Sequence, residues 1–350
     1  MKIKRLSHFK ANSVIELFGF TSEGDDVSLY ELSNKNGMQL KVTNFGATIT
    51  ALKMPLKRGE MVDVVLGFDT LESYIKSFDM ENAPYFGATI GRFAGRINNS
   101  EFALNGTSIH LKKNHKNHSI HGGNGGFSQK IWKVKNVNNG KNPSITLSYF
   151  SSDQEENFLG DLTVELTYTL SDANELMITY TASTTKDTVV NLTHHSYFNL
   201  DGHKSSVSEQ ELMVNSHRLL ETTNDNIPTG RFLNLVNNPF DFSQPKQCPS
   251  KIDNTFILEK EDEFSASLFS RKNLLKMSVY TNQPAVHIYI GGNCFHKIKG
   301  KENADYHSTS GICFETQNFP DAPNHEHFPN SFLKKGEVYY HKTIYKFQSF

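Results

Sequence analysis

Between residues 162 and 182 the chain reads LTVELTYTLSDANELMITYTA. Apolar side chains take every second position from Leu162 to Leu170 and again from Leu176 to Ala182. Because successive side chains of a strand point to opposite faces, this period of two indicates two strands that each have one buried and one polar face. The residues between them, Ser171 to Asn174, are typical of a turn. The stretch is therefore predicted to form a β-hairpin.

Shorter runs of strand-like sequence lie on both sides of this hairpin. They cover residues 38–54, 61–68, 131–137, 144–150, 212–214, 274–280 and 286–290. Asn105-Gly106 predicts a second hairpin, and Thr70 is a suitable N-cap for a short helix over residues 70–75. A helical period is hardly visible anywhere, so the sequence predicts an all-β fold, a β-sandwich with few short helices.

Domain organisation follows from the uniformity of the chain. No repeat of constant length, low-complexity linker or shift in composition divides the 350 residues. We expect one large domain over residues 1–350, in which residues 1–34 form an N-terminal extension or edge strands.

Composition limits the partners. Lys and Arg number 36 against 37 Asp and Glu, and no basic run with interleaved aromatic residues occurs, so nucleic acid is not expected as a partner. No apolar stretch is long enough to cross a membrane. The three cysteines, at 248, 294 and 313, are too few and too widely spaced for a disulfide framework. A reducing, cytoplasmic location is the expectation.

One candidate for chemistry lies near the C-terminus, in residues 311–323. The apolar run from Ile312 to Phe314 predicts a buried strand, which turns polar at Glu315 and breaks at Pro320. A carboxylate held where a buried strand opens into a loop is well placed to transfer protons. Taken alone, a surface Glu at a strand end is the commoner explanation.

Three further polar stretches accompany it. Residues 91–96 carry two arginines between glycines, and residues 115–121 carry three histidines at intervals of three. Residues 191–200 follow an apolar strand and alternate, which would place His195, Tyr197 and Asn199 on one face. Such a face suits a concave binding surface better than a dry core. The histidines lack the companions of a zinc site, so no metal and no cofactor are expected.

These motifs together resemble those of the aldose 1-epimerase, or galactose mutarotase, family. The resemblance keeps family order from about residue 35 to the end, and the segments around His195 and Glu315 are its most specific parts. The segments that carry it are residues 44–48, 91–96, 119–123, 195–200, 227–230, Asp253, 315–322 and 336–337.

The resemblance implies a galactose mutarotase-like supersandwich with a sugar cleft on one sheet, and interconversion of the α- and β-anomers of a free hexose such as galactose or glucose. Glu315 is the implied general base and His195 the implied general acid. A small monosaccharide is the expected partner, bound by a monomer or homodimer. The expected substrate-binding residues are Arg96, His121, Tyr197, Asp253 and His287.

Two positions depart from the family pattern. Gly95 stands where the family usually carries Asn, and His287 stands where a Gln is common. Each change removes an amide that would contact substrate, so the preferred sugar stays open. The pair Glu315 and His195 is intact.

Alternatives remain at this stage. A hexose-6-phosphate 1-epimerase would need extra cations at the cleft, for which Arg92, Arg231 or lysines are candidates. A glycoside hydrolase would need two carboxylates, such as Glu315 with Asp253 or Asp321. A non-catalytic sugar-binding sandwich would need neither an acid nor a base.

Overall fold

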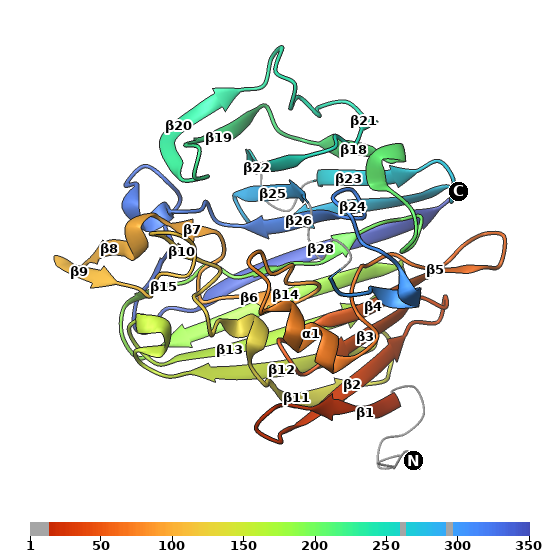
Figure 1. The fold of residues 1–350 in the computed structure, drawn as a ribbon, viewed down its shortest axis with the longest axis horizontal. Helices are drawn as coiled ribbons and strands as arrows, with labels where there is room; N and C mark the ends of the chain where they lie inside the picture. Colours follow the sequence, from red (N-terminus) through yellow and green to blue (C-terminus); the bar gives the residue numbers. More distant parts are fainter. Residues whose placement is uncertain (1–13, 260–263, 292–296) are drawn as a thin grey trace.

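The computed structural model describes residues 14–259, 264–291 and 297–350. Within these residues antiparallel strands form a nine-stranded, a six-stranded and a five-stranded sheet together with several two-stranded ribbons (Figure 1). The all-β prediction is confirmed, with large antiparallel sheets as the main architecture. The one α-helix of the described residues is α1 (Leu71–Ser77), and Thr70 caps it as predicted, because its side chain accepts a hydrogen bond from the amide of Ser73.

The nine-stranded sheet is built around the hairpin predicted at residues 162–182. Leu162 to Leu170 and their partners on the next strand keep one register throughout, and every second residue of the first strand is buried. In spatial order its strands are β11 (Lys133–Asn138), β12 (Ser144–Ser151), β13 (Leu162–Leu170), β14 (Glu175–Thr184), β28 (Tyr339–Ser349), β24 (Leu275–Thr281), β23 (Phe264–Ser270), β18 (Glu211–Val214) and β21 (Lys246–Gln247).

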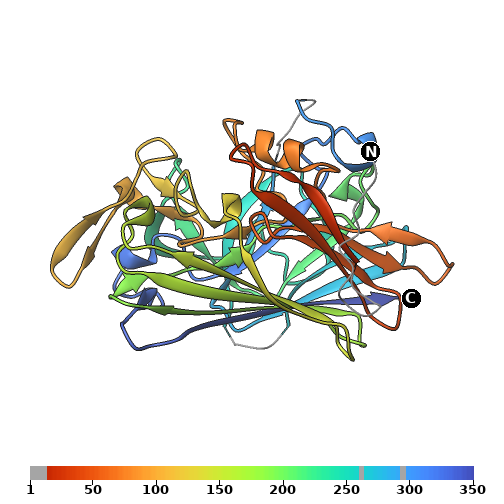
Figure 2. The same ribbon diagram turned by 90° about the horizontal axis from the view of Figure 1, so that it is seen from below.

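The two other large sheets pack on the buried face of this sheet. The five-stranded sheet runs in sequence order through β1 (Val14–Phe20), β2 (Asp26–Ser33), β3 (Gln39–Thr43), β4 (Ile49–Pro55) and β5 (Met61–Asp63). The six-stranded sheet has the order β17 (Tyr197–Phe198), β26 (Ile312–Gln317), β25 (Ala285–Ile290), β22 (Ile252–Ile257), β19 (Arg218–Thr222) and β20 (Pro228–Asn234). One cluster of buried apolar side chains from all three sheets fills the space between the layers seen in Figure 2.

Four two-stranded ribbons complete the architecture of the described residues. They are β6 (Thr89–Ile90) with β16 (Thr193–His194), β7 (Arg96–Ile97) with β10 (Ser119–Ile120), β8 (Glu101–Leu104) with β9 (Thr107–His110), and β15 (Thr188–Val189) with β27 (Phe332–Leu333). The β8–β9 pair is the hairpin predicted at Asn105-Gly106, where both turn residues have positive φ.

Two strand predictions need correction. The run at 61–68 is a strand only over β5, because from Val64 onward the buried chain makes isolated contacts, such as the bridge between Val65 and Phe198. Residues 191–200 do not form one strand: β16 pairs with β6 and β17 pairs with β26, so the chain changes partner between them. That change of partner leaves His195 between the β6–β16 ribbon and the β17 edge of the six-stranded sheet.

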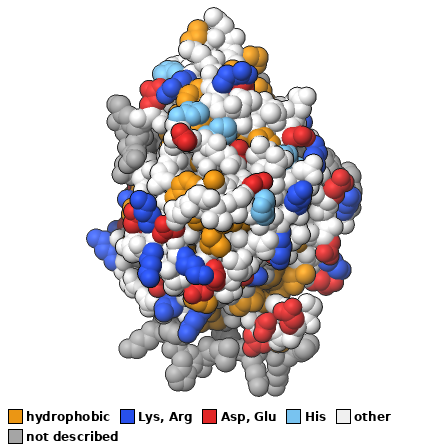
Figure 3. All heavy atoms as spheres, turned by 90° about the vertical axis from the view of Figure 1, so that its left-hand side faces the viewer, with side chains coloured by type: hydrophobic (Ala, Val, Ile, Leu, Met, Phe, Trp, Pro, Cys, Tyr) orange, Lys and Arg blue, Asp and Glu red, His pale blue; other side chains and the backbone are white. Residues whose placement is uncertain are grey.

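Charged side chains of both signs lie on the surface (Figure 3). On the face shown in Figure 3, basic and acidic side chains are interspersed rather than gathered by sign. In the described part of the chain, no helix has the length and apolar character required to span a membrane.

Candidate active site

A cavity of about 810 Å³ opens on the six-stranded sheet, on the face turned away from the core. That volume is in the range of small-molecule sites. Strands β22, β25 and β26 supply its floor, and the ribbons around β7 and β10 supply much of its wall. The predicted residues Arg96, His121, His195, Tyr197, Asp253, His287 and Glu315 all line it.

Strand register places the floor residues. Thr255, His287 and Glu315 are directly opposite one another on β22, β25 and β26, so their side chains share one face. The sequence predicted Glu315 at the end of its strand. It instead lies inside β26, which continues to Gln317. Its side chain is almost completely buried, so the carboxylate is held more rigidly than a strand-end position would allow.

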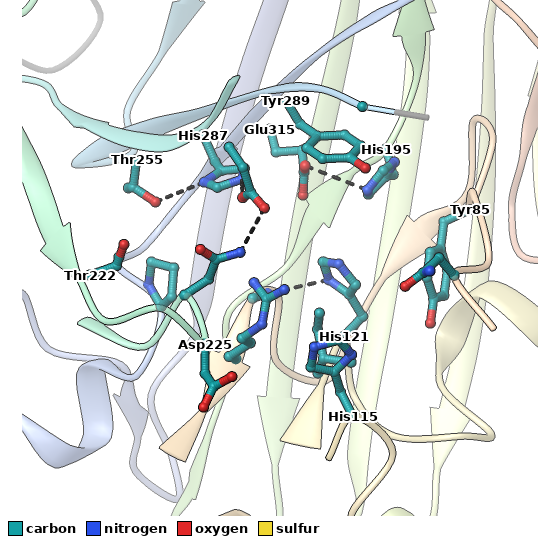
Figure 4. Close-up of a pocket in the computed structure, with 18 of the residues that line it drawn as sticks. Tyr85, His115, His121, His195, Thr222, Asp225, Thr255, His287, Tyr289 and Glu315 are labelled. Atoms are coloured by element: carbon teal, nitrogen blue, oxygen red, sulfur yellow. Dashed lines mark hydrogen bonds and ion pairs between the residues drawn. The ribbon is translucent and has the colours of Figure 1, made fainter. Parts of the chain in front are cut away.

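His195 reaches the floor from the segment between β16 and β17. Its backbone is held by hydrogen bonds from its amide to Ala88 and from the amide of Gly87 to its carbonyl. In the buried side chain, Nε2 lies 3.5 Å from Oε1 of Glu315 (Figure 4). Nδ1 lies 3.7 Å from Sγ of Cys313. An imidazole and a carboxylate thus stand side by side in the cavity.

His121 faces this pair from the opposite wall, as Figure 4 shows. The amide of Gly95 donates to its Nδ1 at 3.3 Å. Burial and the positive charges of His195 and Arg96 hold the pKa of His121 well below its usual value, so the ring is neutral. A neutral ring that accepts at Nδ1 carries its proton on Nε2, so His121 offers a donor to a ligand.

Arg96 and Gln317 add unpartnered polar atoms to the same cavity. Nε of Arg96 and Oε1 of Gln317 are buried and have no hydrogen-bond partner among the described residues. A buried polar atom without a partner is costly, so a ligand rich in donors and acceptors would relieve both.

Asp253 and His287 form a second acid–imidazole pair on the floor. Oδ1 of Asp253 lies 3.1 Å from Nε2 of His287, and Asn226 donates to Oδ2 at 2.9 Å. Asp253 lies within β22 and is held by the pairing of that strand with β25. Burial raises the pKa of Asp253, but the hydrogen bond and charge of His287 outweigh it and lower the pKa overall.

Among the described residues, one group of side chains has the donor types and spacing that a cation could use. Donor atoms of His121, His195 and Glu315 lie within 4.8 Å of one another. The Nε2–H of His121 and the neighbouring guanidinium of Arg96 suit a ligand oxygen better than a cation. Of the three histidines at 115, 118 and 121, His121 belongs to this group, whereas Nδ1 of His118 accepts a hydrogen bond from the amide of Asn99.

Comparisons with known proteins identify the family of the chain. Residues 28–346 match the family described as aldose 1-epimerase. Galactose mutarotase of Homo sapiens is 37% identical over 337 residues, covering 93% of this chain and 95% of that protein. Aldose 1-epimerase of Escherichia coli (strain K12) is 30% identical over 342 residues, covering 93% and 96%.

Solved structures give the same result. A GalM/aldose epimerase homologue from C. elegans superposes with a TM-score of 0.85 at 30% identity, covering 92% of this chain and 99% of that one. Galactose 1-epimerase from Lactobacillus acidophilus NCFM gives 0.83 at 25% identity, covering 96% and 98%.

The chain belongs to the aldose 1-epimerase family. It is an isomerase, with the aldose 1-epimerase activity of that family and a monosaccharide as its substrate class. Membership decides against the hydrolase and the non-catalytic sandwich. Asp321, one carboxylate considered for hydrolysis, is buried away from the cavity, where Oδ1 accepts from the amide of Asn98.

Other polar residues of this aldose 1-epimerase have structural roles. The guanidinium of Arg92 is buried and donates to Ser151, Ser152, Leu159 and Gly160, so it is no cleft cation. Asn199 was expected beside His195, but its amide nitrogen donates to the carbonyls of Ser205 and Ser310.

Several residues that line the epimerase cavity were not predicted from the sequence. Tyr85 packs against the rings of His121 and His195, with centroids 5.1 and 5.8 Å away. Tyr85 and His121 both have φ near +50°, a strained conformation that occurs often in active sites. Thr255 and Asn226 hold His287 and Asp253, and only strand register or loop geometry reveals them. Gly95 also has positive φ, at 78°.

Proposed function

We propose that this enzyme interconverts the α- and β-anomers of a free hexose, with Glu315 as general base and His195 as general acid. The carboxylate of Glu315 takes the proton of the O1 hydroxyl while protonated His195 gives a proton to the ring oxygen O5. The C1–O5 bond breaks and C1 becomes an aldehyde. After rotation about C1–C2, O5 attacks the other face of C1, its proton returns to His195, and Glu315 returns its proton to O1.

The observation that carries this proposal is the 3.5 Å separation of His195 Nε2 and Glu315 Oε1 inside one cavity. O1 and O5 are bonded to the same carbon, so a base and an acid that serve them must lie close together. The two groups are also nearly buried, which excludes water that could compete for either proton.

The rest of the cavity supports a polyhydroxylated ligand. Arg96 and His121 offer donors on one side, and Asp253 offers a carboxylate on the floor. Tyr197 and Tyr289 lie with ring centroids 6.0 Å apart and give an apolar surface on which a pyranose could pack. We propose Arg96, His121, Tyr197, Asp253 and His287 as the substrate-binding residues.

The charge balance favours a free sugar over a sugar phosphate. Lys116 is paired with Asp225 at the rim, which leaves Arg96 and Lys251 as the other Lys or Arg side chains among the described lining residues. Arg231, a candidate phosphate ligand, is paired with Glu221 and does not line the cavity. The carboxylates Glu81, Asp253 and Glu315 would repel a phosphate.

We also propose that the enzyme acts in the cytoplasm as a monomer or homodimer. The described cysteines, Cys248 and Cys313, are buried free thiols, as is common in reducing compartments. Cys294 lies outside the described residues.

The test is polarimetry on freshly dissolved α-D-galactose and α-D-glucose, with the corresponding 6-phosphates as competing substrates. The expected result is faster relaxation of the free hexoses to their equilibrium rotation, with the ratio of the two kcat/KM values reporting the preferred sugar. Acceleration confined to the 6-phosphates would contradict the proposal of a free-sugar substrate.

A further inference from the structure

His287 occupies an unusual place on the cavity floor, between two carboxylates. Its Nε2 lies 3.1 Å from Oδ1 of Asp253, and its Nδ1 lies 2.8 Å from Oγ1 of Thr255 (Figure 4). On the other side, Glu315 is its direct strand partner. Both ring nitrogens are therefore engaged by β22, and the ring itself adjoins the proposed base.

The bond to Thr255 changes direction with the charge of the ring. A neutral imidazole that donates from Nε2 to Asp253 must accept at Nδ1, so the Thr255 hydroxyl donates its proton to the ring. A protonated imidazole donates from both nitrogens, so the same hydroxyl accepts and its own hydrogen is released. Because Thr255 also lines the cavity, the released hydrogen can be donated to a sugar oxygen.

The groups around His287 determine which form prevails. Asp253 faces it from β22, Glu315 from β26, Arg96 from β7 and neutral His121 from the turn after β10, while Lys251 lies near Asp253. Burial lowers the pKa of His287, but the hydrogen bond to Asp253 and the charges of Glu315 and Asp253 outweigh burial and Arg96 and raise it overall. The protonated form therefore persists above the usual value of about 6.5.

We propose that His287 makes sugar affinity depend on pH, because its protonation releases the Thr255 hydroxyl as a donor to the bound sugar. Affinity is highest while the ring is protonated and falls as the ring loses its proton at higher pH. This inference rests on the proposed sugar site. It is separate from the proton transfers assigned to Glu315 and His195, which determine turnover.

Direct binding of a sugar that cannot react tests the proposal. 1,5-Anhydro-D-galactitol lacks the anomeric hydroxyl, so its Kd can be measured by calorimetry without ring opening. From about pH 6 to about pH 9 the Kd of the wild-type enzyme should rise about three- to tenfold, the range for one hydrogen bond. In His287→Gln, which keeps a polar side chain but cannot titrate at this position, that rise should be lost, and any smaller dependence that remains reports other groups of the cavity such as His195, the proposed donor to the ring oxygen.

Two further measurements complete the test. In Thr255→Val the Kd should be raised and should depend on pH no more than in His287→Gln, while ¹⁵N–¹H NMR of the imidazoles still shows His287 titrating. Because the His287 signal is absent from His287→Gln, that variant assigns it. A Kd that rises as steeply with pH in His287→Gln as in the wild-type enzyme, or a wild-type Kd that falls with rising pH, would overturn the proposal. If the wild-type enzyme bound the analogue but did not accelerate the relaxation of fresh hexoses in polarimetry, the proposed reaction would be refuted and the proposal for His287 would not.

Discussion

The two faces of the six-stranded sheet differ in polarity: on the same three strands, one face carries polar and titratable side chains and the other carries apolar ones. On β22, β25 and β26, the face toward the cavity carries Thr255, His287 and Glu315, and the face toward the core carries apolar residues that include Ile288 and Phe314. Sequence neighbours thus belong to different environments. The core face holds the strands rigid, and the cavity face uses that rigidity to keep reactive groups in position.

Glu315→Gln is the sharpest way to break the chemistry of the cavity face alone. The amide has nearly the same shape as the carboxylate but cannot accept a proton, so kcat should fall by about 10²–10⁴, the range for a lost general base. Polarimetry on fresh α-D-galactose measures this loss. The melting temperature should change little, because the core face of β26 is untouched.

A charge-matched control separates a local effect from a general one. Glu165 is exposed on β13, far from the cavity, so Glu165→Gln removes one negative charge with no expected effect on kcat. Wild-type activity in Glu315→Gln would show that the base has been assigned wrongly.

His195→Asn should have the next largest effect, at least about a hundredfold in kcat, because the ring oxygen loses its proton donor. The exposed His217 supplies the control, His217→Asn, which should retain the wild-type rate. Equal losses in kcat and kcat/KM would indicate a group that acts in the transition state. A rise in KM alone would reassign His195 to substrate binding.

Phe314→Ala tests the other face of the same strand. Phe314 is completely buried beside Phe198, so truncation should lower the free energy of unfolding by about 3–5 kcal/mol. Urea unfolding measures this change. If the two faces are separate in function, kcat well below the melting temperature should fall far less than in Glu315→Gln. A comparable loss of turnover would show that the faces cannot be separated.

The comparison also explains what the sequence could predict. Alternation within β13 and β14 reports burial directly, so the fold class and the main hairpin followed from it. Prediction of the site depended on the resemblance, because Glu315, His195 and His287 come from three separated segments. Only strand pairing and the change of partner between β16 and β17 bring them together. Alternation predicted one continuous strand through His195, and this was wrong. Alternation carries no information about which strand will be the partner, so it could not reveal the change of partner between β16 and β17.

Other features of the site have no local signal at all. The wall residue Tyr85 lies in a loop with φ of 51°, and no periodicity marks such a position. Arg92 and Arg96 are similar in sequence context, yet Arg92 is buried among carbonyls and Arg96 lines the cavity. Their different roles follow from which loops lie opposite each one, and this is decided by tertiary structure.

The smallest expected effect concerns the core face of the six-stranded sheet, where a few buried polar side chains also occur. Next to Glu315 on β26, but on the core face, Oγ1 of Thr316 lies 3.2 Å from Nε2 of His341. Nδ1 of His341 donates to the carbonyl of Leu192. Burial, only partly opposed by that hydrogen bond, lowers the pKa of His341 to about 3. Unlike the ring of His287, the ring of His341 is therefore neutral at all pH values well above 3, and its role is structural.

That neutrality should appear as acid sensitivity. Below about pH 6.5 the unfolded chain protonates this histidine while the folded enzyme does not, so stability is lost as pH falls, by about 1.4 kcal/mol per pH unit for each such group. His194, whose pKa burial also lowers to about 3, should contribute similarly. Urea unfolding between about pH 7 and pH 4.5 should show a shallower dependence in His341→Gln than in the wild-type enzyme. Equal slopes would mean that His341 takes up its proton in the folded state, and that the core face is less dry than its packing indicates.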